Sequence, residues 1–569
     1  MAREISFPKT RHVTLSAAGH SELQAKAEGA EALLLPIELA EEEARLLPAA
    51  PTEAPAPGPP PAAPAPATRV LPRLVSVDIA VPASAADRCS AADGSPLEVR
   101  CANSLEGRQH AGDAAARAVQ LGEAALLAGL DCWYRTEGAG FCRSCELALV
   151  EFLRESYGDH LQPFDPLEQL RASALPPRDR PFARQKEALR LLESIESAKR
   201  AVLRARDEAR RSRGLEIPVL GRVGTLSAPA LELCAHLDGL VFDLPSLDPM
   251  EALLPLLAAR AALGLRPAIA TLPASSTVAQ VRLFGAVTAA CDTDLLLAPG
   301  ASEEAHAALA AHLEFLALVR ERYRPAQALV DAEILVSPTC DHWTDGAHQR
   351  GASACAVALI GAHMQPAVRL DLSGGTRAPL LVIAGGAAIS GSDAAAARRH
   401  VEAGGDALIV GRCATIDEEG RPGEVVFPEV KSGLERVGEG RVYAVEEAAP
   451  GALDALLTRA LRELWGRGRA HFTLSGRGRL FLRAYLDPER KLDVHLVNLE
   501  LRDDGFAAAQ GMQLSIAGQA AGGGRSGYWF APERDGGRDG ERITLSPSGF
   551  SVSTILPGID AYALLAVPR

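Results

Sequence analysis

The chain has 569 residues, which is enough for about three domains at roughly 100–200 residues each, and it can bury several cores without disulfides. Its net charge is −13 with acids and bases interspersed, which argues against a nucleic-acid-binding protein and gives no reason to expect binding to anionic membranes. No apolar run reaches the ~18–20 residues that span a bilayer and no signal region follows Met1, so we expect a cytoplasmic protein.

The first part of the chain alternates short apolar runs with helical segments. Residues 48–68 are almost wholly Pro and Ala, a composition that cannot form a packed core and that predicts an extended surface insertion. Strands are expected at residues 12–15, 32–37, 73–80, 130–135, 217–220, 237–243, 267–270 and 294–297, and helices at 22–31, 111–129, 145–157 and 181–213. This alternation predicts a (β/α)₈ TIM-type barrel over residues 1–325.

A second α/β pattern covers residues 326–465. Ser390 is expected to cap a helix that runs to Ala403, and strands are expected at 333–337, 380–386 and 407–412. This is the parallel pattern of a flavodoxin-like domain.

After about Arg467 the apolar residues repeat with a period of two. Strands are expected at 471–474, 480–485, 492–498, 512–516 and 561–567. Short strands with this period predict a small all-β sandwich over residues 466–569.

The order of the three predicted domains, together with several motifs, resembles glycoside hydrolase family 42, the β-galactosidases, and its degenerate relatives. The motifs are the cysteine loop 141–145 with a following helix that ends in Tyr157-Gly158, the segment 380–421, and the strand 494–498. The resemblance implies a β-galactosidase-like protein that acts on or binds carbohydrate. It also implies that the second domain resembles a trimerisation domain, and therefore that the chain forms a homo-oligomer, a trimer.

Retaining glycosidases need two carboxylates about 5–5.5 Å apart, and barrel enzymes carry them at strand ends. The resemblance places the acid/base at Glu137, although Thr136 stands where the family has Asn. The alternative for Glu137 is a solvated loop carboxylate. The late strand 267–273, where the family has its nucleophile, contains no carboxylate, while Asp243 ends another strand and is the candidate for a second acid or for a helix N-cap.

The missing nucleophile leaves three hypotheses for the function of the chain. The first is a glycoside hydrolase that uses Glu137 as the acid/base. The second is a non-catalytic relative that binds carbohydrate or serves as an oligomeric scaffold. The third is an unrelated binding protein that only shares the architecture, because fold alone does not determine function.

Cys142 and Cys145 form a CxxC pair, which is a common half-site for zinc. The resemblance adds the upstream Cys101 as a third ligand of a structural zinc ion, with Cys132 or Cys89 as the fourth. A metal-free pair of thiols is the alternative, and no other cofactor is expected.

Cys340, His342 and His348 follow a strand of the second predicted domain. The resemblance implies a surface loop without catalysis at this position.

Overall fold

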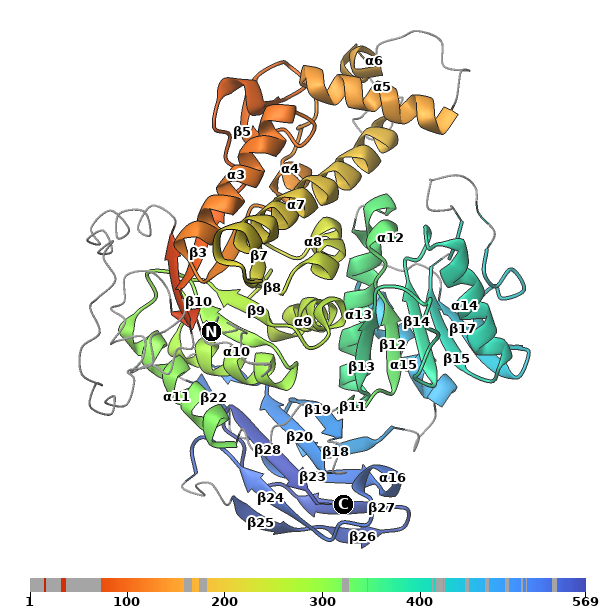
Figure 1. Ribbon diagram of the computed structural model, residues 1–569. Coiled ribbons are helices and arrows are strands. Elements are labelled where there is room, and N and C mark those ends of the chain that lie inside the picture. Colours follow the sequence, from red (N-terminus) through yellow and green to blue (C-terminus); the bar gives the residue numbers. More distant parts are fainter. Residues whose placement is uncertain are drawn as a thin grey trace, which may run out of the picture. The chain divides into compact units, whose positions relative to one another are not determined.

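Figure 1 shows the computed structural model of the chain. The structure describes residues 15–16, 32–36, 73–157, 166–172, 182–319, 327–344, 346–411, 413–415, 423, 425–445, 450–465, 470–486, 491–502, 505–507, 509–534 and 540–568. The Pro/Ala segment 48–68 and the helix expected at 22–31 lie outside these ranges. Of the helices within them, none is long and apolar enough to cross a membrane.

The chain divides into two compact units. The first comprises Met1–Val223 with His236–Val241, and the second comprises Gly224–Ala235 with Phe242–Arg569. This division differs from the three predicted domains, because it cuts the first predicted domain near residue 223 and keeps the remainder of the chain together.

The first unit is built on parallel strands that follow one another in sequence order (Figure 1, red to yellow). These strands are β1 (Leu15–Ser16), β2 (Ala32–Pro36), β3 (Arg73–Asp78), β6 (Ala124–Ala128) and β7 (Val219–Val223). A small antiparallel hairpin, β4 (Arg88–Ser90) and β5 (Pro96–Arg100), and the helices α3 (Leu105–Leu121), α4 (Cys132–Arg135), α5 (Arg143–Tyr157), α6 (Pro166–Ala172) and α7 (Ala183–Arg213) complete the described part. Helix α3 packs on β3 and along α7.

Two predictions in this unit are wrong. The helix expected at 111–129 ends at Leu121, and β6 follows it. The strand expected at 130–135 is the short helix α4. The sequence of β6 is Ala-Ala-Leu-Leu-Ala, all good helix formers, but the strand is almost fully buried in a parallel sheet, where continuous apolar runs are usual.

The second unit begins with alternating helices and strands. These are α8 (Ala228–Leu233), α9 (Pro249–Leu263), β9 (Ala268–Leu272), α10 (Val278–Ala290), β10 (Asp294–Leu297) and α11 (Glu303–Val319), while β8 (Gly239–Asp243) is divided between the units. Strands β9 and β10 are parallel. Among the described strands β10 does not pair with β1, so the structure shows parallel strands of the barrel type without a closed ring.

A parallel sheet with strand order β13-β12-β14-β15-β17-β16 follows. Numbered along the chain, its five parallel strands have the order 2-1-3-4-5 that is typical of flavodoxin-like domains, and only β16 is antiparallel. Ser390 caps α14 as expected, because its side chain accepts a hydrogen bond from the backbone N–H of Asp393. The elements are β12 (Ala332–Leu335), α12 (Pro338–Trp343), α13 (Ala347–Gly361), β13 (Pro366–Arg369), β14 (Leu380–Ala384), α14 (Gly391–Glu402), β15 (Asp406–Val410), β16 (Gly433–Val437), β17 (Gly440–Val445) and α15 (Pro450–Trp465).

The C-terminal part of the second unit is built mainly on two antiparallel sheets, one of six strands and one of four (Figure 1, blue). Leu482 and Val494 from one sheet and Leu514 and Ile516 from the other belong to a single buried cluster, so the two sheets share one core. The main strands are β18 (Phe472–Arg477), β19 (Leu480–Leu486), β20 (Leu492–Asn498), β23 (Gln510–Ala517), β24 (Ser526–Phe530), β27 (Ser551–Ile555) and β28 (Tyr562–Val567).

His348 and Cys340 are buried, which corrects the expected surface loop. His348 lies on α13 in the second unit, where its Nδ1 donates to the carbonyl oxygen of Ala384 at 2.6 Å and its Nε2 accepts from the backbone N–H of Ser337 at 2.9 Å. Both ring nitrogens are therefore used by the neutral imidazole. Burial lowers the pKa of His348 to about 4.

We expect this histidine to make stability depend on pH between about 4 and 6.5. Between these pH values the imidazole is protonated in the unfolded chain but neutral in the folded chain. The contribution of His348 to the free energy of unfolding is therefore fully present above pH 6.5 and falls as the pH is lowered. The contribution lost between pH 7.5 and pH 5 is about 2 kcal/mol. Urea unfolding of wild type and His348→Gln at both pH values measures it, and an equal pH dependence in the two proteins would contradict the assignment.

Candidate metal centre

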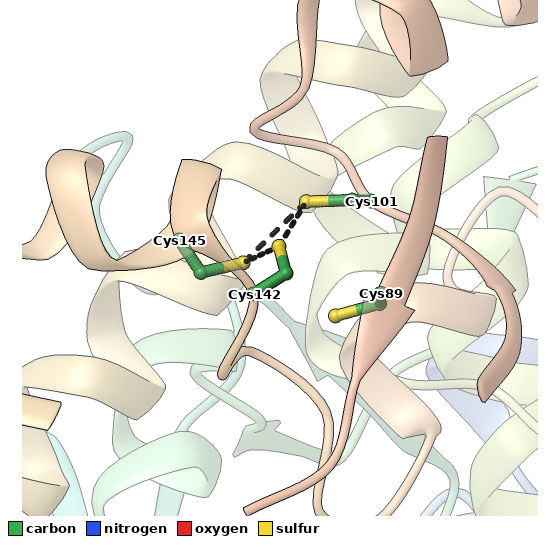
Figure 2. A group of neighbouring side chains, drawn as sticks. All are labelled: Cys89, Cys101, Cys142 and Cys145. Carbon is green, nitrogen blue, oxygen red and sulfur yellow. Dashed lines mark hydrogen bonds between the residues drawn. The ribbon is translucent and has the colours of Figure 1, made fainter. Parts of the chain in front are cut away.

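Four cysteine side chains from separate segments of the first unit meet at one point (Figure 2). Cys89 lies on β4, Cys101 directly follows β5, Cys142 directly precedes α5, and Cys145 lies in the first turn of α5. All four sulfur atoms lie within 4.8 Å of one another. The Sγ of Cys101 is 3.3 Å from that of Cys142 and 3.4 Å from that of Cys145, and the last two are 3.4 Å apart.

The β4–β5 hairpin explains how two of these cysteines become neighbours. Asp93 accepts hydrogen bonds from the backbone N–H and the hydroxyl of Ser95, and Gly94 between them has a φ of +85°, a conformation that favours glycine. The hairpin register pairs Arg88 with Arg100. The cysteine that follows each of these arginines is thereby brought to the same end of the hairpin.

Nitrogen donors surround the sulfur atoms. The Sγ of Cys89 accepts from the backbone N–H of Gly140 at 3.1 Å and from the indole N–H of Trp133 at 3.4 Å, and the Sγ of Cys145 accepts from the side-chain amide of Asn103 at 3.5 Å. The three neighbouring thiols, Cys101 first, and the indole N–H of Trp133 hold the pKa of the Cys89 thiol below its ordinary value. Such N–H donors are the usual partners of metal-bound thiolates.

Two buried cations of α7 hold the chain that leads to Cys142. The Nζ of Lys186 donates to the carbonyl oxygen of Ala139 at 2.7 Å and lies 4.4 Å from the ring centroid of Phe141. The Nη2 of Arg190 donates to the carbonyl oxygens of Trp133, Tyr134 and Thr136 at 2.7–2.8 Å. The loop between α4 and α5 is therefore fixed by side chains from a distant helix.

The four thiols fit a tetrahedral metal ion. A zinc ion with Zn–S bonds of about 2.3 Å separates its sulfur ligands by about 3.8 Å, which a set of sulfurs within 4.8 Å can reach with small side-chain movements. All the described cysteines are free thiols and three of these four are buried. Four protein thiolates leave no open coordination position, so such an ion would cross-link the hairpin to α5 and would not bind substrate.

The structure brings together Cys101, Cys142 and Cys145, the three residues that the sequence analysis proposed as ligands. Of the two candidates for the fourth position, Cys89 joins them. Cys132 does not, because it lies exposed on α4.

The candidate catalytic carboxylates occupy different surroundings. Glu137 lies in the loop after α4, separated from the end of β6 by that helix, and its side chain is exposed. Asp243 is the last residue of β8 and is partly buried. The carboxylates nearest the ends of β3 and β6 are Asp78, which accepts from the N–H of Ala80 at 2.8 Å, and the buried Asp131, which is 4.0 Å from Arg135.

Comparison with known proteins gives structural matches only. No family model and no curated protein sequence matches the chain. The β-galactosidase from Bacillus circulans sp. alkalophilus matches with a TM-score of 0.68 at 11% identity, over 99% of both chains. The GH42 β-galactosidase from G. stearothermophilus matches with a TM-score of 0.65 at 9% identity, over 96% of this chain and 95% of the other. The α-L-fucosidase isoenzyme 2 from Paenibacillus thiaminolyticus matches with a TM-score of 0.60 at 12% identity, over all of both chains. The chain therefore has the fold of the GH42 β-galactosidases.

Proposed function

We propose that this chain is a glycoside-hydrolase-like protein that binds carbohydrate without hydrolysing it. The fold is the one in which solved β-galactosidases and a fucosidase are built, which favours a carbohydrate ligand. The observation that carries the loss of hydrolysis is the position of Glu137. A general acid of a barrel enzyme must be held at the scissile bond by the end of a strand, and an exposed loop carboxylate beyond α4 does not meet this condition.

The cysteine cluster is proposed to hold a structural zinc ion. Its role is to fix the hairpin β4–β5 against α5, and with them Trp133, whose indole N–H is bound to Cys89. The residues of the cluster take no part in chemistry, because every coordination position is filled by the protein.

Assembly and location are part of the same proposal. The flavodoxin-like domain has the place in the chain that the trimerisation-like domain was expected to take, so we propose a homotrimer. The cytoplasmic location expected from the sequence is kept as part of the proposal. Light scattering coupled to size-exclusion chromatography measures the mass, and a value of one chain would contradict the trimer.

We expect no turnover of nitrophenyl β-galactosides, α-fucosides or β-glucosides by wild type or by Glu137→Gln. The reason is that Glu137, the candidate acid/base, lies in an exposed loop beyond α4 and is not held at the end of β6. Release of nitrophenol, measured at 400 nm against a family 42 enzyme as the positive control, tests this. Turnover by wild type that falls at least about 100-fold in Glu137→Gln would establish a glycosidase with Glu137 as acid/base and would overturn the proposal.

A further inference from the structure

A small cavity lies in the first unit beside the C-terminal ends of β3 and β6. Its walls come from the chain just after these strands, from the end of β5, and from α3, α4 and α7. Its volume is about 30 Å³, which is room for one or two water molecules or for one hydroxyl group of a larger ligand. The polar or aromatic residues that line it are Arg100, Trp133, Ser194 and Ser197.

Two of these side chains are buried and carry polar atoms without a partner. Arg100 is 7% exposed and Ser194 is 2% exposed. The Nη2 of Arg100 donates to the carbonyl oxygen of Val81 at 2.5 Å. Within the part of the chain that the structure describes, its Nη1 has no acceptor and the hydroxyl of Ser194 makes no hydrogen bond. A buried polar group without a partner costs roughly 1–3 kcal/mol, so two at one cavity indicate that a ligand or water completes them.

The charges around the cavity favour a neutral ligand. The Nε of Arg100 lies 3.9 Å from a carboxylate oxygen of Asp87, which is fully buried and also accepts from His110 at 2.9 Å. Asp78, at the end of β3, is a second carboxylate that acts on Arg100. Because these acids already balance the guanidinium, an added anion would meet repulsion, whereas a hydroxyl group would accept from Nη1 without it.

We propose that this cavity receives one hydroxyl group of a neutral saccharide, which accepts a hydrogen bond from Arg100 and exchanges a second one with Ser194. Trp133 supplies an apolar surface beside it, since its indole N–H is already bound to Cys89. This inference rests on the proposed carbohydrate-binding function and adds to it the place and the residues of the contact.

Ser194→Ala tests the contact without endangering the fold. In the unliganded protein the hydroxyl of Ser194 has no partner, so its removal should leave the melting temperature unchanged or raise it. Binding of D-galactose, D-glucose and L-fucose is measured by titration with saturation-transfer-difference NMR. For the sugar that binds wild type, we expect Ser194→Ala to lower the affinity about 3- to 10-fold, which corresponds to the loss of one hydrogen bond. Ser194→Val, which fills the cavity, should abolish binding.

Ser212→Ala is the matched control, because Ser212 lies exposed on the same helix and bonds only to the carbonyl oxygen of Glu208 within it. It should bind the sugar as wild type does. Equal affinity in wild type and both Ser194 variants would overturn the contact and leave carbohydrate binding elsewhere intact. Binding of none of the three sugars would overturn both the contact and the proposed function. A third outcome is that sodium acetate, and none of the sugars, stabilises wild type against heat and that Ser194→Val loses this stabilisation. The cavity would then bind an anion, and the proposed neutral ligand would be wrong.

Discussion

Purified protein is expected to contain about one zinc ion per chain, and Cys101→Ser is expected to lose it. Cys101 is in contact with both cysteines of the CxxC pair, so its loss leaves an incomplete set of three thiolates and removes one of the two links between the hairpin and the CxxC pair. Binding of structural zinc contributes about 10–16 kcal/mol to small zinc peptides. In Cys101→Ser we expect the first unit to lose only part of that free energy, because the unit also has a hydrophobic core of its own. The expected decrease in the free energy of unfolding is about 3–5 kcal/mol.

The measurement is metal content by mass spectrometry of the intact protein, followed by thermal unfolding. A loss of this size lowers the melting temperature of the first unit by about 10 °C. EDTA should have the same effect on wild type and little effect on Cys101→Ser, because the variant has no zinc left to lose.

Two further variants separate the ligands from the other cysteines. Cys89→Ser should behave as Cys101→Ser does, because both sulfurs belong to the cluster. Cys132→Ser should keep the metal and the stability of wild type, because Cys132 is exposed on α4. Wild-type protein without zinc after expression in zinc-containing medium, or zinc retained by Cys101→Ser, would contradict the metal site.

The elements that could be predicted from the sequence are those whose pattern is local. Helix α7 and the alternating strands β19 and β20 were expected within two residues of their observed bounds, because charged helical turns and a period of two mark them. Strand β6 was missed because Ala and Leu favour a helix in isolation, and only burial in the parallel sheet makes this segment a strand.

The site was predictable to the same extent. The CxxC pair is a local signal, whereas Cys89 could be assigned only by the pairing of β4 with β5. The Asp93-Gly94 turn was the available signal for that hairpin. Lys186, Arg190 and Ser194 sit in a helix that is rich in charge, and nothing in their spacing distinguishes the buried from the exposed ones. The roles of Lys186 and Arg190 depend on contacts with segments about fifty residues away in the chain.

Arg190→Met is expected to destabilise the first unit by about 3–5 kcal/mol and to loosen the metal centre. The Nη2 of Arg190 donates hydrogen bonds to three carbonyl oxygens at the end of α4, and the residue is 5% exposed. Methionine fills a similar volume but donates no hydrogen bond. The three carbonyl groups would then have to find water in a largely buried place, and Glu187 would lose its 2.7 Å ion pair.

The consequence for the metal follows from the position of Trp133. Arg190 fixes the carbonyl group of this residue and lies 5.8 Å from its ring centroid, while the indole N–H binds the Sγ of Cys89. Loss of a residue that hydrogen-bonds to a metal ligand typically lowers the metal affinity about 10- to 100-fold. We therefore expect zinc to dissociate from Arg190→Met at least about 10-fold faster than from wild type. The rate is measured by the absorbance of a chromogenic chelator added in excess.

Arg200→Met is the control for this variant, because Arg200 is exposed on the same helix and the substitution is identical. It should release zinc at the wild-type rate. Arg190→Lys should fall between the two, since an ammonium group restores the charge but cannot reproduce the planar guanidinium that reaches three carbonyl groups at once. Release at the wild-type rate by a folded Arg190→Met would mean that the cysteines alone hold the ion, and that the helix only covers the loop.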